Sequence, residues 1–181
     1  MKKFELTNEF VTNMFGTKLF RIRALVEFGD VEAGELGGYV EKESNLGHDD
    51  NAWVYGNAWV YGDAQVSGDA LVYGNAWVYG DAQVSGDAWV CGDARVCGNG
   101  DYAYAHGFGS VNRTTTFFRL KDGGVGVRCG CFYGTLAQFR DKIRETHGET
   151  KKAQEYLMLA DLMELRFEED ENEVGNRKYV E

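Results

Sequence analysis

A six-residue pattern of buried and variable positions dominates the middle of the chain. Residues 51–98 are eight consecutive copies of the unit [Asn/Asp]-Ala-x-Val-x-Gly. The alanine and the valine of each unit are two positions apart, which is the alternation of a short strand with one buried face. Glycine accepts a positive φ, and Asn or Asp can hydrogen-bond to its own backbone. The Gly-Asn and Gly-Asp pairs therefore predict a bend after every unit.

The outward positions repeat every 18 residues, because residues 57–70 are identical to residues 75–88. Three units therefore form one coil, and the sequence predicts the triangular cross-section of a left-handed parallel β-helix. The expected fold class is therefore mainly β. Aromatic residues replace the valine at Tyr102 and Phe108, which predicts a cap that closes the stack near this point.

Stacked coils sort the outward side chains into one polar face and two faces with apolar ladders. The first ladder is formed by Trp53, Leu71 and Trp89 beside Tyr55, Tyr73 and Cys91. The second is formed by Trp59, Trp77 and Arg95 beside Tyr61, Tyr79 and Cys97. A soluble monomer rarely leaves this much apolar surface bare, and Trp and Tyr are enriched in interface hot spots. The Trp, Tyr and Leu residues of both ladders are thus candidate binding residues. We expect the terminal segments to cover one ladder and subunits to pack through the other, with a foreign partner as the alternative.

The segments around the repeat predict a division into residues 1–50, 51–110 and 111–181. In the first, residues 18–25 alternate like a strand, and Val40 and Leu46 are spaced like a degenerate unit that caps the open end of the stack. In the last, residues 114–133 predict a β-hairpin folded at 121–124.

Two helices are expected after that hairpin. Thr135-Leu-Ala-Gln138 is a capping box that opens a helix ending near Gly148. A second helix, about 151–167, has two apolar sides, so we expect it to need two neighbours, one of which could be the same helix of another subunit. The acidic tail after Phe167 is expected to fray.

The formal charge of −10 argues against general binding to DNA or anionic lipid, which requires clustered Lys and Arg. The partner is therefore expected to be a protein, with a homo-oligomer (dimer or trimer) and no direct nucleic-acid or membrane contact. The basic residues between 113 and 144 are interpreted as a solvated face. No apolar run reaches the length of a membrane span, no signal peptide is recognisable, and the four cysteines suit a reducing cytoplasm.

Candidate chemistry is sparse, and we expect no cofactor. Many hexapeptide β-helices are acyltransferases that use a His as general base, but the repeat contains no His and no insertion. His106 is the one reasonable base, with a place in an aromatic cap as the alternative interpretation. Cys129 and Cys131 are expected to point the same way on one strand, and with His147 they form a weak candidate metal site.

The flanking motifs resemble a family of hexapeptide-repeat proteins from phages, prophages and conjugative elements. The resemblance rests on Gly-Glu-Leu-Gly-Gly-Tyr-Val-Glu-Lys-Glu-Ser-Asn-Leu at 34–46, and on Cys-Gly-Cys-Phe-Tyr-Gly-Thr-Leu at 129–136 with Glu-Thr-His-Gly at 145–148. It implies a mobile-element protein of a bacterial cytoplasm. We therefore expect a non-enzymatic protein that binds a host protein, most specifically an inhibitor of a defence effector such as a CRISPR nuclease. The alternatives are a hexapeptide-repeat acyltransferase and a structural scaffold.

Overall fold

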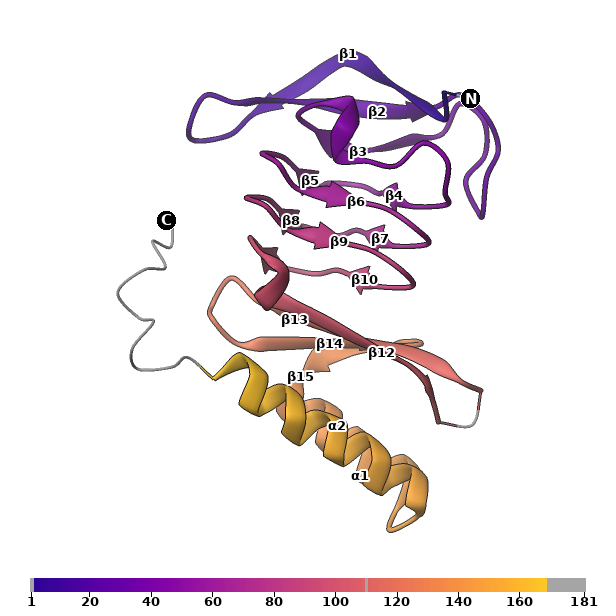
Figure 1. The fold of residues 1–181 in the computed structure, drawn as a ribbon, viewed down its shortest axis with the longest axis vertical. Helices are drawn as coiled ribbons and strands as arrows, with labels where there is room; N and C mark the ends of the chain where they lie inside the picture. Colours follow the sequence, from indigo (N-terminus) through magenta and orange to yellow (C-terminus); the bar gives the residue numbers. More distant parts are fainter. Residues whose placement is uncertain (1, 110, 169–181) are drawn as a thin grey trace.

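The computed structural model describes residues 2–109 and 111–168, and their elements are stacked along one axis (Figure 1). The N-terminal strands are β1 (Phe4–Thr12), β2 (Lys18–Ala24) and β3 (Leu36–Val40). The repeat forms β4 (Trp53–Val54), β5 (Trp59–Val60), β6 (Gln65–Val66), β7 (Leu71–Val72), β8 (Trp77–Val78), β9 (Gln83–Val84), β10 (Trp89–Val90) and β11 (Arg95–Val96). The C-terminal part contains β12 (Tyr102–Phe108), β13 (Arg113–Arg119), β14 (Val125–Cys129), β15 (Phe132–Thr135), α1 (Leu136–His147) and α2 (Lys151–Phe167).

The repeat is a left-handed parallel β-helix of the predicted kind. Strands three units apart pair in parallel, so that β4, β7 and β10 form one face, β5, β8 and β11 the second, and β6 and β9 the third. Trp59 pairs with Trp77, 18 residues further on. The alanine and the valine of every unit are fully buried. The predicted coil of three units and the predicted division into three faces are therefore confirmed.

The degenerate unit before the repeat is confirmed as the first layer of the stack. Val40 pairs with Val60, and Leu46 bridges to Val66 in parallel. The Gly-Gly pair of the motif at 34–46 has a packing role here. A Cβ on Gly37 would lie 2.6 Å from the carbonyl oxygen of Val54, and one on Gly38 would lie 2.6 Å from that of Ala58. Only glycine allows β3 to lie this close to the coil beneath it.

The N-terminal strands add a cap that the sequence predicted in part. Strand β2 is confirmed, whereas β1 was not predicted; the two pair antiparallel, and β2 pairs antiparallel with β3. Phe4 and Phe28 pack edge-on against the indole of Trp53, at ring-centroid distances of 6.1 and 5.3 Å. Trp53 is fully buried beneath them. The expectation that a terminal segment covers one ladder therefore holds for the first coil of the first ladder.

A four-stranded antiparallel sheet of β12, β13, β14 and β15 closes the other end. The predicted hairpin corresponds to β13 and β14, but its expected last residue, Tyr133, belongs to the additional strand β15. The last coil of the β-helix is hydrogen-bonded to β13 and to the turn that follows it. The Trp89 amide donates to Thr116 Oγ1 (2.9 Å), and the Lys121 amide donates to the Asp93 carbonyl oxygen (3.0 Å). Phe118 joins the core of the β-helix from this sheet.

Helices α1 and α2 cover the opposite side of that sheet (Figure 1). The capping box is confirmed, because Thr135 Oγ1 accepts from the Gln138 amide and Gln138 Oε1 accepts from the Thr135 amide. One side of α2 is buried, whereas Met158, Leu162 and Leu165 on its other side are 71%, 54% and 68% exposed. The acidic tail predicted after Phe167 lies, apart from Glu168, outside the described residues.

No helix in the described residues is long and apolar enough to cross a membrane.

Candidate binding groove

A groove of about 520 Å³ runs along the first ladder, from the loop after β2 to the C-terminal sheet. Its volume lies within the range of ligand sites in proteins, about 300–1,000 Å³. The coils form its floor, the loop at 29–31 forms one end, and residues 112–114 of the β12–β13 hairpin with the C-terminal end of β14 form the other. We call this surface the ladder groove.

The floor of the ladder groove consists of three predicted binding residues, one from each coil. Tyr55 and Leu71 are half-buried, and Trp89 is 36% exposed. Burial raises the pKa of the Tyr55 hydroxyl, and the nearby carboxylates of Glu35 and Asp30 raise it further. The floor therefore has apolar surface from each of the three coils, and the Tyr55 phenol is neutral at neutral pH.

One side of the groove is a column of turn residues that repeat every 18 positions. Asn51, Asp69 and Asp87 each begin a six-residue unit and lie in successive coils on this corner of the β-helix. The side-chain amide of Asn51 donates to Asp69 Oδ1 at 2.8 Å. The two carboxylates make this side of the groove acidic.

Two arginines close the lower end of the ladder groove, which is the end at the C-terminal sheet. The guanidinium of Arg128 lies over Trp89 and Tyr73, 5.5 and 5.9 Å from the ring centroids, and Arg113 lies beside Gly130. Within residues 2–109 and 111–168, neither arginine forms an ion pair with a carboxylate. The Nε of Arg128 is buried without a hydrogen-bond partner. This end therefore carries positive charge that the described residues do not neutralise.

His106, the candidate general base, stands on the groove wall. Its Nδ1 lies 2.8 Å from Thr114 Oγ1 and 3.4 Å from Asp87 Oδ2, and its side chain is 58% exposed. A carboxylate-histidine-hydroxyl relay engages the two ring nitrogens separately, whereas both contacts here are made at one nitrogen. The arrangement holds the ring in place and does not activate the Thr114 hydroxyl.

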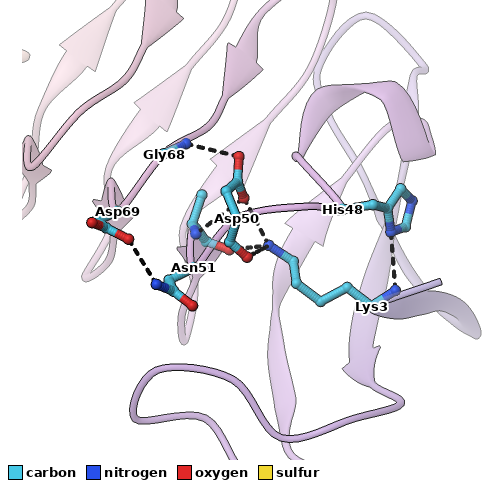
Figure 2. Close-up of polar contacts among 7 residues, drawn as sticks. Lys3, His48, Asp50, Asn51, Gly68 and Asp69 are labelled. Carbon is cyan, nitrogen blue, oxygen red and sulfur yellow. Dashed lines mark hydrogen bonds and ion pairs between the residues drawn. The ribbon is translucent and has the colours of Figure 1, made fainter. Parts of the chain in front are cut away.

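The end of the groove at the loop 29–31 is fixed by a clamp between the buried Lys3 and the half-buried Asp50, shown in Figure 2. Lys3 Nζ donates to the carbonyl oxygen of Asp50 (3.0 Å), to Asp50 Oδ1 (3.0 Å) and to the carbonyl oxygen of Ala52 (2.9 Å). Asp50 Oδ2 accepts from the Gly68 amide of the next coil at 2.8 Å. Burial lowers the pKa of Lys3, and the Asp50 carboxylate opposes this shift.

The clamp also holds the aromatic cover over the first coil. The Lys3 amide donates to His48 Nδ1 (3.2 Å), the Phe4 ring stacks on His48 at 4.4 Å, and Lys3 Nζ lies 4.7 Å from the centroid of Phe28. Because the loop that follows Phe28 forms the end of the ladder groove, the clamp determines where the groove stops.

The second ladder packs mainly on itself. Trp59 and Trp77 stack with centroids 4.7 Å apart and planes 3° apart, and Arg95 covers Trp77 at 4.0 Å. Tyr61 and Tyr79 stack at 5.3 Å. Burial raises the pKa of Tyr61 to about 12, and Tyr79 adds to the shift. Both faces of the Trp77 indole and one face of the Trp59 indole are therefore covered within the chain.

The candidate metal ligands are not arranged as the sequence suggested. Cys129 ends β14, but Cys131 lies in the turn that follows, because Gly130 has a positive φ of 57° and turns the chain. Cys129 Sγ contacts the hydroxyls of Thr115 and Tyr156, and the ring of His147 stacks on Tyr156. In the described part of the chain, no group of three or more His, Cys, Asp or Glu could hold a metal ion.

Sequence reasoning identified the floor of the groove but missed its charged sides. Asp69 and Asp87 could have been found from the 18-residue period, which places them on the corner next to Leu71 and Trp89. Arg113 and Arg128 were interpreted as part of a solvated face, and no local signal could place them here. Their position depends on how the C-terminal sheet docks on the last coil.

The comparison with known families matches the repeat alone. A family model described as the YdcK beta solenoid repeat matches residues 64–81, which is the length of one coil. No curated protein matches the chain. Together with the fold, this similarity defines the class: a β-helix protein built from hexapeptide repeats.

Proposed function

We propose that this chain is a non-enzymatic protein-binding module that receives its partner in the ladder groove. The observation that carries the proposal is the exposed indole of Trp89 beside Leu71 and Arg128, in a concave surface. Trp, Tyr and Arg are the residue types that dominate interface hot spots. These side chains stand on a hydrogen-bonded stack of parallel strands, so binding requires little ordering of the backbone beneath them.

The specific form of the proposal is binding to a host protein in a bacterial cytoplasm, with inhibition of a nucleic-acid-targeting defence effector such as a CRISPR nuclease. Two features support it: the resemblance of the flanking motifs to mobile-element proteins, and the formal charge of −10. An acidic surface can occupy a basic nucleic-acid channel.

Affinity capture with two matched variants tests the binding module. Trp89→Ala removes the exposed indole of the groove, and Gln83→Ala truncates an exposed residue on the polar face. We expect the wild-type chain and Gln83→Ala to retain the same host protein, and Trp89→Ala to bind it at least about tenfold more weakly. Equal retention by both variants would contradict binding in the groove. Trp53 is unsuitable for this test because it is buried and supports the core.

The inhibitor form is tested by infecting bacteria whose CRISPR nuclease targets the infecting phage. Expression of the wild-type chain should restore plaque formation, and Trp89→Ala should not restore it at equal protein level. If the captured host protein is not part of a defence system and plaque numbers do not change, the inhibitor form is refuted while the binding module stands.

Acyl transfer remains the alternative, favoured by one observation: His106 lies on the wall of a groove large enough for a ligand. The test is release of free CoA from acyl-CoA in the presence of candidate acceptors. Turnover that His106→Ala abolishes would replace the binding module with an enzyme.

The scaffold alternative and the homo-oligomer also remain proposals. The β-solenoid repeat fold is consistent with a hexapeptide-repeat scaffold. However, within the described residues strands β1 to β3 and the β12–β15 sheet cover the two ends of the stack, which disfavours end-to-end growth. Self-association would therefore use a side of the molecule, and the exposed row at Met158, Leu162 and Leu165 of α2 is the surface on which to test it.

A further inference from the structure

We propose that the ladder groove binds a short extended peptide segment with three features: an apolar side chain, a lysine or arginine beside it, and a carboxylate at one end. This inference rests on the proposed function and names the chemistry of the partner. Each feature of the peptide corresponds to a separate part of the groove.

The apolar side chain corresponds to the floor. Leu71 and Trp89 are adjacent members of one parallel ladder, paired directly in register. The indole of Trp89 remains 36% exposed although one edge of the groove shelters it. Covering this strip removes apolar surface from water, which is the non-specific part of the affinity.

The basic side chain corresponds to the turn column. Asp69 and Asp87 lie on the side of the floor in successive coils, about 4.8 Å apart along the axis. Asp69 has one hydrogen bond from an uncharged amide, and Asp87 lies 3.4 Å from His106. No lysine or arginine of the described residues pairs with either carboxylate, so a bound ammonium or guanidinium group supplies the counter-charge.

The carboxylate corresponds to the lower end, at Arg113 and Arg128. The guanidinium of Arg128 contacts the rings of Trp89 and Tyr73, and its Nη1 donates a hydrogen bond to the Cys131 carbonyl oxygen at 3.4 Å. It is therefore fixed in place before a ligand arrives. Guanidinium groups bind carboxylates through paired hydrogen bonds, which adds geometric specificity to the charge.

The dimensions suit a peptide of four or five residues. Tyr55, Leu71 and Trp89 belong to three successive coils, so the floor extends over about 10 Å along the axis. Four extended residues span about 13 Å, which reaches from Tyr55 past Trp89 to the arginine end. A nucleic-acid strand fits poorly, because its phosphates would lie along the column of Asp69 and Asp87.

A library of fluorescent pentapeptides, randomised one position at a time, tests the inference by fluorescence polarisation on the full chain. We expect selection for Lys or Arg at one position and for Asp, Glu or the free C-terminus at another. Asp69→Asn/Asp87→Asn should weaken the first preference about tenfold and leave the second, and Arg113→Gln/Arg128→Gln should do the opposite. Asp63→Asn/Asp81→Asn, at the same turn position on another corner, is the matched control and should change neither.

Three outcomes would overturn the inference. These are a library without charge preference, a preference that the groove variants leave unchanged, and tighter binding of a short single-stranded oligonucleotide than of any peptide. Thermal unfolding of each variant shows whether the fold is retained. If the inference fails while capture of a host protein still depends on Trp89, the binding module stands and only the stated chemistry of its partner is wrong.

Discussion

At the scale of single residues, a few polar groups that are buried or half-buried position the end of the ladder groove. Lys3 and Asp50 are the best example, because they connect the N-terminal strand to the first coil and to the amide of Gly68. Burial of an ion pair does not by itself stabilise a fold, but loss of one partner leaves the other unpaired. The pair therefore specifies where the N-terminal segment lies.

Asp50→Ala is expected to lower the free energy of unfolding by about 2 kcal/mol, because Lys3 would lose its counter-charge and the Gly68 amide its acceptor. Urea unfolding followed by circular dichroism measures the change. Asp63→Ala is the matched control, since Asp63 forms an exposed pair with Lys42 and should cost less than about 0.5 kcal/mol. Equal losses in the two variants would show that the clamp does not stabilise the fold.

Alkaline pH should destabilise the second ladder through Tyr61. Its pKa in the folded chain is about 12 against an ordinary value of 10.0, because burial disfavours the phenolate and Tyr79 lies beside it. A raised folded pKa gives a stabilising contribution that is complete below pH 10 and is lost as pH rises through about 12. Urea unfolding of Tyr61→Phe between pH 9 and pH 11 should show a smaller loss of stability than that of the wild-type chain. Equal losses of stability in the wild-type chain and in Tyr61→Phe would contradict the assignment of this pH dependence to Tyr61.

At the scale of elements, the sequence determined most of the β-helix and both helices. Each coil is a local structure whose buried alanine and valine follow one short period, so the three faces could be assigned from residue numbers. The capping box at Thr135 is equally local. Strand β1 was missed because its side chains lack a strict alternation and its partner, β2, supplies the pairing.

The glycines of the N-terminal motif give an element-scale prediction. Gly38→Ala should lower the free energy of unfolding by about 2–3 kcal/mol, because the added methyl group overlaps the Ala58 carbonyl oxygen and would push β3 away from the first coil. Gly124→Ala is the control. Its Cβ would meet the end of the Asp122 side chain at 3.1 Å and otherwise lie at ordinary contact distance, 3.9 Å from Leu120 Cδ1, so the cost should stay below about 0.5 kcal/mol. Urea unfolding of both variants measures the two changes in the free energy of unfolding. A change for Gly38→Ala as small as that for Gly124→Ala would refute the close packing of β3 on the first coil.

At the scale of the whole molecule, the two caps close a groove along one ladder of the repeat. The N-terminal cap buries Trp53, and the C-terminal sheet brings Arg113 and Arg128 to the end of the same ladder. The resulting groove joins segments that are about 100 residues apart in the sequence. Local pattern could therefore predict the floor of the site but not its ends, because docking between distant segments sets those ends.

The predicted homo-oligomer is tested at the exposed side of α2. If two subunits pack there, Leu162→Glu should reduce the mass measured by light scattering to that of a monomer, 20.3 kDa, since a buried charge would face an apolar partner. Gln65→Glu, on the polar face of the β-helix, should leave the mass unchanged. A wild-type chain that is already monomeric would remove the oligomer from the account without affecting the groove.

Site-specific photo-cross-linking tests the central claim most directly, because it reports contact with the ladder groove itself. A photoreactive phenylalanine derivative at position 71 places the reactive group on the groove floor, and the same derivative at position 65 places it on the polar face. The account predicts that the captured host protein is cross-linked from position 71 and not from position 65. Cross-linking from position 65 alone, or equally from both positions, would contradict it.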